Sequence, residues 1–196
     1  VHREARRLSS LVDDFLDLQG LDQARFRIVP TKLDVREVVR EQASVHARDD
    51  AHPIRLELPD APVEVLADEQ CFNQVMMNVI ANAIIHSGKN SDIRIGMMDS
   101  ATAGEIGLYV ADNGVGMPQA LINDLGQPFP QVRNSYVRAE NSSHLAGSGL
   151  GYTIIKRLLD LNGGRFVVES QQGKGTRVIL YWRKADGVSE QSRVTA

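Results

Sequence analysis

The sequence reads Asp112-Asn113-Gly114-Val115-Gly116-Met117 at the end of an alternating apolar segment, and Gly147-Ser148-Gly149-Leu150-Gly151 about 30 residues later. Glycine at positions 114 and 116 allows sharp turns and a close ligand approach that a Cβ atom would prevent. The second stretch leads into a helical pattern, whose free N-terminal N–H groups and positive dipole end attract phosphate. The two stretches therefore predict turns that contact a nucleotide.

The carboxylate of Asp112 can accept a hydrogen bond from an amino group, the group by which adenine differs from guanine at its six position. Val115 and Met117 are apolar and suited to line a base pocket. The alternative is a plain Asp-Asn-Gly turn, and a Gly-x-Gly-x-Gly run alone is weak support for a ligand. The second stretch is neither a Walker motif, since no Gly-Lys-Ser/Thr follows, nor a Rossmann turn, since no strand precedes it.

Asn78 and Asn82 lie four residues apart in a predicted helix, so their amides share one face at about 6 Å along the axis. Their apolar neighbours should face the core, where unpartnered carboxamides cost stability. Taken alone, the pair is more typical of a polar stripe on a solvated face. Mg²⁺ favours the other interpretation, because it takes oxygen ligands and is commonly completed by substrate phosphates.

Apolar periodicity and turn residues predict the elements of the remaining chain. Helices are expected over residues 4–18, from the N-cap Asp34 to 46–50, and over 68–86, 118–125 and 152–161. Strands are expected over residues 26–29, 54–58, 63–66, 93–97, 106–111, 166–169 and 177–182. The strands 54–58 and 63–66 are expected to pair. The irregular polar segment 127–146 is long enough to be functional or disordered.

Composition limits the class of protein. The 196 residues, 42% of them hydrophobic, can bury one core with a helical extension. A net charge of −3 gives no global attraction to nucleic acid or to an anionic membrane. No apolar run approaches the roughly 20 residues that span a bilayer. Cys71 is the only cysteine, which fits a reducing, cytoplasmic compartment. Because the chain begins at Val1 within a helical pattern, we expect a fragment of a longer protein, whose parent could be membrane-anchored.

Five motifs in this order resemble those of the ATP-binding domain of sensor histidine kinases, in the superfamily that includes gyrase, the MutL repair ATPases and the ninety-kilodalton heat-shock chaperones. They are the N box at 78–83, the first glycine box at 112–116, the phenylalanine motif Pro128-Phe129, the second glycine box at 147–151 and the closing glycine motif at 173–176. The resemblance covers roughly residues 33–182. It implies an α/β two-layer sandwich of the Bergerat type, in which three helices cover one face of a mixed β-sheet and residues 127–146 form a lid over ATP.

The resemblance also implies the cofactors ATP and Mg²⁺ and the residues that hold them. Asn78 and Asn82 are the implied catalytic and metal-binding residues. The implied nucleotide-contacting residues are Asn78, Asn82, His86, Asp112, Gly114, Gly116, Met117, Phe129, Gly147, Ser148, Gly149, Leu150, Gly151 and Thr176. For His86, a structural role at the helix end is an equal alternative.

One residue position distinguishes the ATPases of the superfamily from its kinases. Its ATPases carry Glu four residues before the second Asn, where this chain has Asn78, and an amide cannot activate water as a base. The resemblance therefore implies a protein-histidine kinase, which transfers the γ-phosphoryl group to a His for relay to a response-regulator Asp. That His belongs to a helix absent from this chain, because His2 is followed by Arg3 rather than by an acidic residue.

Three parts of the chain follow from this interpretation. Residues 1–23 are the C-terminal helix of a truncated dimerisation and phosphotransfer hairpin, 24–184 the ATP-binding catalytic domain and 185–196 a disordered tail. The apolar stripe of the first part, Leu8, Leu11, Val12, Phe15 and Leu18, predicts a homodimer in the full-length protein. No nucleic-acid partner and no direct membrane contact by this chain are expected.

Two departures leave a second function open. Ile85 stands where many relatives place Lys or Arg to reach the phosphates, and Tyr152 stands where Leu usually follows the second glycine box. Lys89, Arg133, Arg138 or His144 could supply the missing positive charge. The alternative function is a degenerate kinase module that binds a nucleotide or a partner without phosphotransfer. A conformational ATPase is disfavoured by Asn78.

Overall fold

The computed structural model describes residues 28–46, 53–88, 91–126 and 151–185. The elements are β1 (Thr31–Asp34), α2 (Val35–His46), β2 (Ile54–Glu57), β3 (Glu64–Ala67), α3 (Glu69–Ser87), β4 (Ile93–Asp99), β5 (Glu105–Asp112), α4 (Gln119–Asn123), α6 (Gly151–Leu161), β6 (Arg165–Gln171) and β7 (Gly175–Arg183). The helix expected over 4–18, the lid segment, residues 147–150 and the tail from 186 lie outside the described residues.

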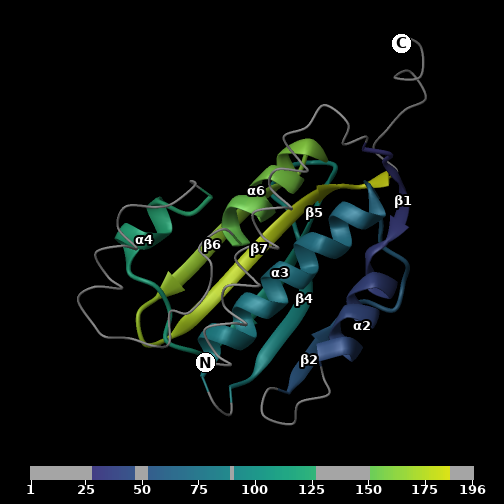
Figure 1. The fold of residues 1–196 in the computed structure, drawn as a ribbon. Coiled ribbons are helices and arrows are strands. Elements are labelled where there is room, and N and C mark those ends of the chain that lie inside the picture. The colour runs from purple at the N-terminus through teal and green to yellow at the C-terminus, as the bar shows by residue number, and fades with distance from the viewer. Residues whose placement is uncertain (1–27, 47–52, 89–90, 127–150, 186–196) are drawn as a thin grey trace, which may run out of the picture.

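The main sheet has five strands in the order β2-β4-β5-β7-β6 (Figure 1). The β2–β4 pair is parallel and the other pairs are antiparallel, so the sheet is mixed, as predicted. The turn at Gly104, which has a φ of 79°, joins β4 to β5, and the 172–174 turn joins β6 to β7. A second, two-stranded sheet pairs β1 with β3.

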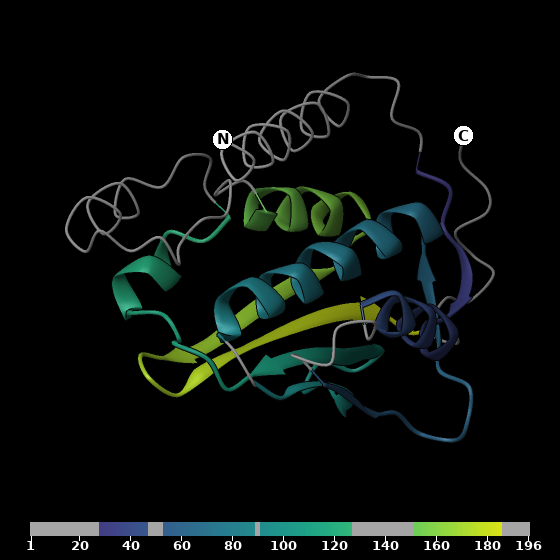
Figure 2. The ribbon, with the colours of Figure 1, turned by 60° about the horizontal axis from the view of Figure 1, so that its bottom comes forward.

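Helices cover one face of the main sheet. Figure 2 shows α3 and α6 side by side over the strands, and α2 packs beside α3, where Gln42 Nε2 donates to Asn73 Oδ1 at 3.0 Å. The core between the layers includes Phe72 of α3 and Trp182 of β7, whose ring centroids lie 5.0 Å apart. The predicted α/β two-layer sandwich is thus confirmed. No helix in the described ranges is long and apolar enough to cross a bilayer.

The outer face of the sheet carries no helix in the described part of the chain and is closed by stacked side chains. Arg177 lies over the ring of Tyr109 at 4.1 Å and Arg165 over the ring of Tyr181 at 3.7 Å. Arginine stems and aromatic rings cover apolar surface while the charge stays hydrated. Ile179, between these pairs, is only 2% exposed.

The predicted pairing of 54–58 with 63–66 is wrong. β2 runs parallel to β4, with Ile54 opposite Ile93, and β3 pairs with β1. The intervening 59–62 segment is held by α2 instead of forming a hairpin turn: Arg36 donates to the carbonyls of Pro59 and Asp60. Arg36 also pairs with Asp34 at 2.7 Å, which lowers the pKa of that carboxyl to about 2.

Of the strand predicted over 26–29, residues 26 and 27 lie outside the described residues, and Ile28 and Val29 are not in a strand, because β1 begins only at Thr31. Pro30 has no N–H to give to a ladder. The Val29 N–H donates to Asp68 Oδ2 at 2.9 Å, which ties the entering chain to the start of α3 rather than to a strand. The last difference is small: α4 ends at Asn123 rather than at 125.

Candidate nucleotide site

Asp112 is the last residue of β5, and its carboxylate is fixed on one side only. Oδ1 accepts from the N–H of Gly114 at 2.8 Å and from the N–H of Thr176 at 3.3 Å. No residue in the described part of the chain donates to Oδ2. Burial raises the pKa of Asp112 although both N–H donors lower it. The group is therefore a half-paired, partly buried acceptor, which suits recognition of an amino group.

The 113–117 loop is tightly bound to the protein around it. A Cβ at Gly114 would collide with Ser87 and with the His86 carbonyl at the end of α3, and one at Gly116, with a φ of 63°, would collide with the Gln171 carbonyl. The glycines thus allow the loop to wedge between α3 and the β6–β7 turn. The Met117 side chain is partly buried, whereas Val115 is 56% exposed.

Ser170 on β6 contacts the candidate site, although the sequence did not predict it. Its Oγ accepts from the Met117 N–H at 2.8 Å and donates to the Gly175 carbonyl at 2.9 Å. It also shares a hydrogen bond of 2.9 Å with Thr176 Oγ1. The only indication of this contact is the β6–β7 strand register, which pairs Ser170 directly with Thr176. Ser170 therefore links the loop after β5 to the closing glycine motif.

Asn78 and Asn82 lie on α3 among buried residues, with partly buried side chains. The Nδ2 atoms of both amides are buried and have no hydrogen-bond partner among the described residues. A Cβ added to Gly151 would lie 3.4 Å from Asn82 Nδ2, so Asn82 faces the first turn of α6. The predicted alternative of a solvated polar stripe is thus not what the structure shows.

Unpaired buried amides are costly unless something else completes them. A half-turn of a carboxamide exchanges its oxygen and its N–H₂, so the same side chain can present oxygen to a cation or N–H to a phosphate. The pair therefore fits Mg²⁺ bound to phosphate oxygens. No cluster of three or more His, Cys, Asp or Glu side chains in the described ranges offers another metal site.

The remaining predicted residues divide into two groups. His86 is partly buried, and its carbonyl accepts from the Val115 N–H at 3.5 Å, so α3 ends against the Asp112 loop. Thr176 is 9% exposed and contacts Asp112 through its N–H. Phe129, Gly147, Ser148, Gly149 and Leu150 lie outside the described residues, as do Lys89, Arg133, Arg138 and His144. Ile85 is 50% exposed.

Residues 67–186 match the family described as histidine kinase-, DNA gyrase B-, and HSP90-like ATPase. The chain is 28% identical over 91% of its length to the histidine protein kinase DivJ of Caulobacter vibrioides and covers 29% of that protein. It spans about a third or less of the first curated relatives that it matches.

Two solved structures share the fold. Full-length ShkA in complex with AMPPNP has a TM-score of 0.73 at 23% identity, covering 91% of this chain and 36% of that one. The histidine kinase ThkA in complex with the response regulator protein TrrA has a TM-score of 0.70 at 22% identity, covering 93% and 48%. Since the family match spans more than half of the chain, this protein belongs to the histidine kinase-, gyrase- and HSP90-like ATPase family, as the ATP-binding catalytic domain of a sensor histidine kinase.

Proposed function

We propose that this chain binds Mg²⁺ and ATP between Asp112 and the Asn78–Asn82 pair, and that its parent protein transfers the γ-phosphoryl group to a His on a helix upstream of this chain. The observation that carries the proposal is the pair of buried, unpartnered amide nitrogens on α3, of which that of Asn82 lies close to the first turn of α6. Two such groups in the buried part of one helix are unfavourable unless a ligand completes them.

Each residue has a distinct task in this proposal. The free Oδ2 of Asp112 accepts from the adenine amino group, while Oδ1 stays bound to the Gly114 and Thr176 amides. Asn78 and Asn82 hold the cation and the phosphates through their amides. When bound, Mg²⁺ neutralises charge on the phosphates during transfer. Met117 contacts the base, and Gly151 begins the helix whose N-terminus faces the phosphates.

Phosphotransfer is favoured over hydrolysis by the chemistry of position 78. An amide side chain neither takes nor gives a proton near neutral pH, so Asn78 cannot activate a water molecule. The second candidate is a nucleotide-binding scaffold without phosphotransfer, and the exposed, uncharged Ile85 is the observation that favours it.

The partners in this proposal follow from the relatives. ThkA was solved with a response regulator protein, and we propose a response regulator as the partner of the parent of this chain as well. We also propose that the parent forms a homodimer through the 1–23 helix and is cytoplasmic. The proposal includes no nucleic-acid contact and no direct membrane contact by this chain.

Isothermal titration of ATP with Mg²⁺ into the native chain and into Asp112→Asn tests the base site. We expect micromolar-range binding by the native chain and its loss in the variant, since Asn can present an N–H₂ group to the adenine amino group. Native chain that does not bind would overturn the proposal. Transfer from labelled ATP to a separate acceptor-hairpin fragment then distinguishes the kinase, which labels the fragment, from the scaffold, which binds ATP without labelling it.

A further inference from the structure

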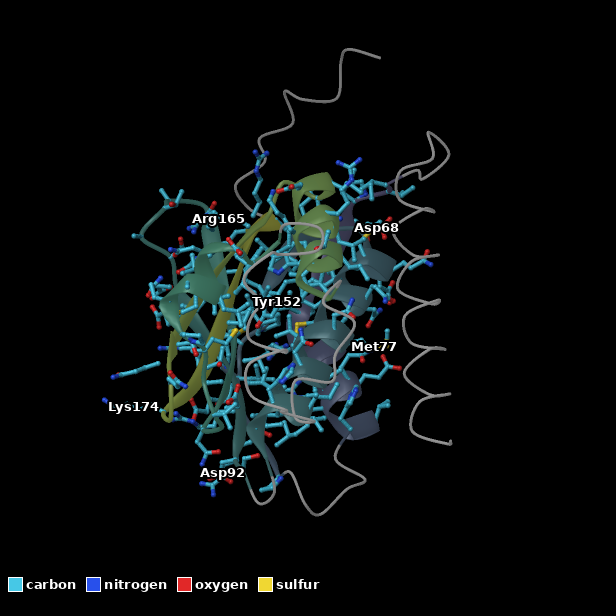
Figure 3. All side chains as sticks on the ribbon, turned by 60° about the vertical axis from the view of Figure 1, so that its left-hand side comes forward. Asp68, Met77, Asp92, Tyr152, Arg165 and Lys174 are labelled. Carbon is cyan, nitrogen blue, oxygen red and sulfur yellow. The ribbon has the colours of Figure 1, made fainter. Side chains whose placement is uncertain are left out.

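Ser170 lies near the end of β6, just before the turn that joins β6 to β7, where Lys174 is labelled in Figure 3. Three groups lie within hydrogen-bond distance of its hydroxyl oxygen: the Met117 N–H at 2.8 Å, the Gly175 carbonyl at 2.9 Å and Thr176 Oγ1 at 2.9 Å. A serine hydroxyl has one proton to donate and two lone pairs with which to accept. The three partners therefore use its whole hydrogen-bonding capacity.

The directions of these three bonds follow from the chemistry of the partners. The Met117 N–H can only donate and the Gly175 carbonyl can only accept, so the single Ser170 proton goes to the carbonyl. In the one arrangement that satisfies all three partners, the Thr176 hydroxyl then donates to Ser170. Removal of the Ser170 hydroxyl would leave a backbone donor and a backbone acceptor without this partner, which is costly for partly buried groups.

The Gly175 carbonyl and the Thr176 N–H belong to the same peptide group. A peptide group is planar and trans, so its carbonyl and its N–H point in opposite directions. Ser170 holds the carbonyl, and the N–H on the other side donates to Asp112 Oδ1 at 3.3 Å. Glycine at position 175, with a φ of 94°, adds backbone freedom that would let this peptide group rotate. The Ser170 hydroxyl thus fixes the direction of an N–H that Asp112 accepts.

The second donor to Asp112 is connected to Ser170 as well. Oδ1 of Asp112 also accepts from the Gly114 N–H at 2.8 Å. Met117, three residues further along the same loop, donates its N–H to Ser170. The loop after β5 and the closing glycine motif, which supply the two donors to Asp112, therefore share one side-chain partner, the Ser170 hydroxyl.

We propose that Ser170 is a positioning residue for the nucleobase: its hydroxyl orients the peptide group between residues 175 and 176 and the 113–117 loop, and both hold the Asp112 carboxylate with Oδ2 free to accept from the adenine amino group. This inference rests on the proposed ATP site, and it assigns Ser170 no contact with the nucleotide. Burial raises the pKa of Asp112, and the N–H donors of Gly114 and Thr176 lower it. Loss of either donor would therefore raise this pKa further.

Ser170→Ala removes the hydroxyl, and Ser170→Thr keeps a hydroxyl on a side chain that suits a strand. We expect Ser170→Ala to weaken ATP binding about tenfold, the size of one lost hydrogen bond. It should also raise the pKa of Asp112 in the nucleotide-free chain, because the Thr176 N–H is no longer directed at the carboxylate. Ser170→Thr should retain both native values. Titration calorimetry measures the affinity, and a ¹³C NMR titration of the carboxyl group measures the pKa.

Ser100→Ala is the matched control, because the Ser100 hydroxyl also accepts from a backbone N–H, that of Thr102, and donates to a side chain, that of Glu105. Glu105 lies at the opposite end of β5 from Asp112. The control should lose stability while the ATP affinity and the Asp112 pKa keep their native values.

Three results would overturn the inference. They are an unchanged Asp112 pKa in Ser170→Ala, an unchanged ATP affinity in Ser170→Ala, and an equal loss of affinity in Ser170→Thr or Ser100→Ala. Native chain that binds no ATP would overturn the proposed function and with it the role of Ser170 in base binding. A raised Asp112 pKa in Ser170→Ala would even then support the positioning of the carboxylate, so the two failures are distinguishable.

Discussion

The polar groups at the start of helix α3 have hydrogen-bond partners, whereas two buried amide nitrogens in its middle have none among the described residues. At the start, Asp68 Oδ1 accepts from the Cys71 N–H at 3.0 Å, Oδ2 accepts from Val29, and the Asp68 N–H donates to Asn162 Oδ1 at 2.9 Å. In the middle, the Nδ2 atoms of Asn78 and Asn82 are buried without a partner among the described residues. Both parts pack on one core. The hydrogen bonds at the start of α3 are completed by the protein, whereas its middle leaves two buried N–H₂ groups without a partner among the described residues.

Of these substitutions, Asn82→Ala should have the largest effect, and this effect should be on the affinity for ATP rather than on stability. We expect the affinity for ATP with Mg²⁺ to fall about 10- to 100-fold, because hydrogen bonds to charged groups contribute roughly 1.5–3 kcal/mol. Unfolding free energy without nucleotide should be unchanged or higher, since a buried unpaired amide is lost. Calorimetry and urea unfolding check both.

Asn73→Ala is the control on the same helix, because the Asn73 amide already accepts from Gln42 at 3.0 Å. It should reduce stability slightly and leave ATP affinity unchanged. If the two Asn variants lose affinity equally, the contrast between paired and unpaired amides has no functional meaning.

Asp68→Ala should have the opposite profile. Removal of an N-cap costs about 1–2 kcal/mol of unfolding free energy, and here the bond to Val29 is lost as well. The dissociation constant for ATP should stay within about twofold, which is the reproducibility expected of independent sites. Asp68→Asn should lose less stability, because Asn is also a good N-cap. A weakened ATP affinity at unchanged stability would contradict this assignment.

The sequence predicted the elements that carry the candidate site residues better than it predicted the strand partners. Asn78, Asn82 and Asp112 stand in motifs whose order in the chain is itself informative, and helix periodicity placed the Asn pair on one face. Alternation predicted β2 as a strand, but it carries no information about the partner, which is β4, on the far side of α3 in the sequence. Ser170 was missed for the same reason, since only the β6–β7 register brings it to Thr176.

The smallest expected effect concerns two carboxylates with opposite pKa shifts. Burial raises the pKa of Asp112 in the folded state, so stability falls as the pH rises above the ordinary value of 3.8, and the loss is complete above the folded-state pKa. Asp112→Asn keeps an Oδ1 acceptor and should be equally stable or up to about 1 kcal/mol more stable at pH 7. Its advantage should shrink as the pH falls through the folded pKa of Asp112. Urea unfolding between pH 3 and 7 measures this.

Asp34 provides the control of opposite sign. Its pKa is lowered to about 2, first by the hydrogen bond from Arg36, so its contribution is present above the ordinary value of 3.8 and is lost as the pH falls toward 2. Asp34→Asn should therefore lose about 1 kcal/mol of stability at pH 7, because the hydrogen bonds from Arg36 to this carboxylate lose their charge assistance. Equal pH profiles for the two variants would contradict the assignment of these pKa shifts.

The Asn78 and Asn82 amides can be observed directly while ATP binds. In a ¹H–¹⁵N spectrum of the native chain, the side-chain N–H₂ signals of Asn78 and Asn82, assigned with single Ala variants, are followed as ATP and Mg²⁺ are added, with Asn73 as an internal reference. We expect large shifts for Asn78 and Asn82 and none for Asn73. Saturated ATP binding with all three amide signals unmoved would show that the unpaired groups of α3 do not hold the ligand.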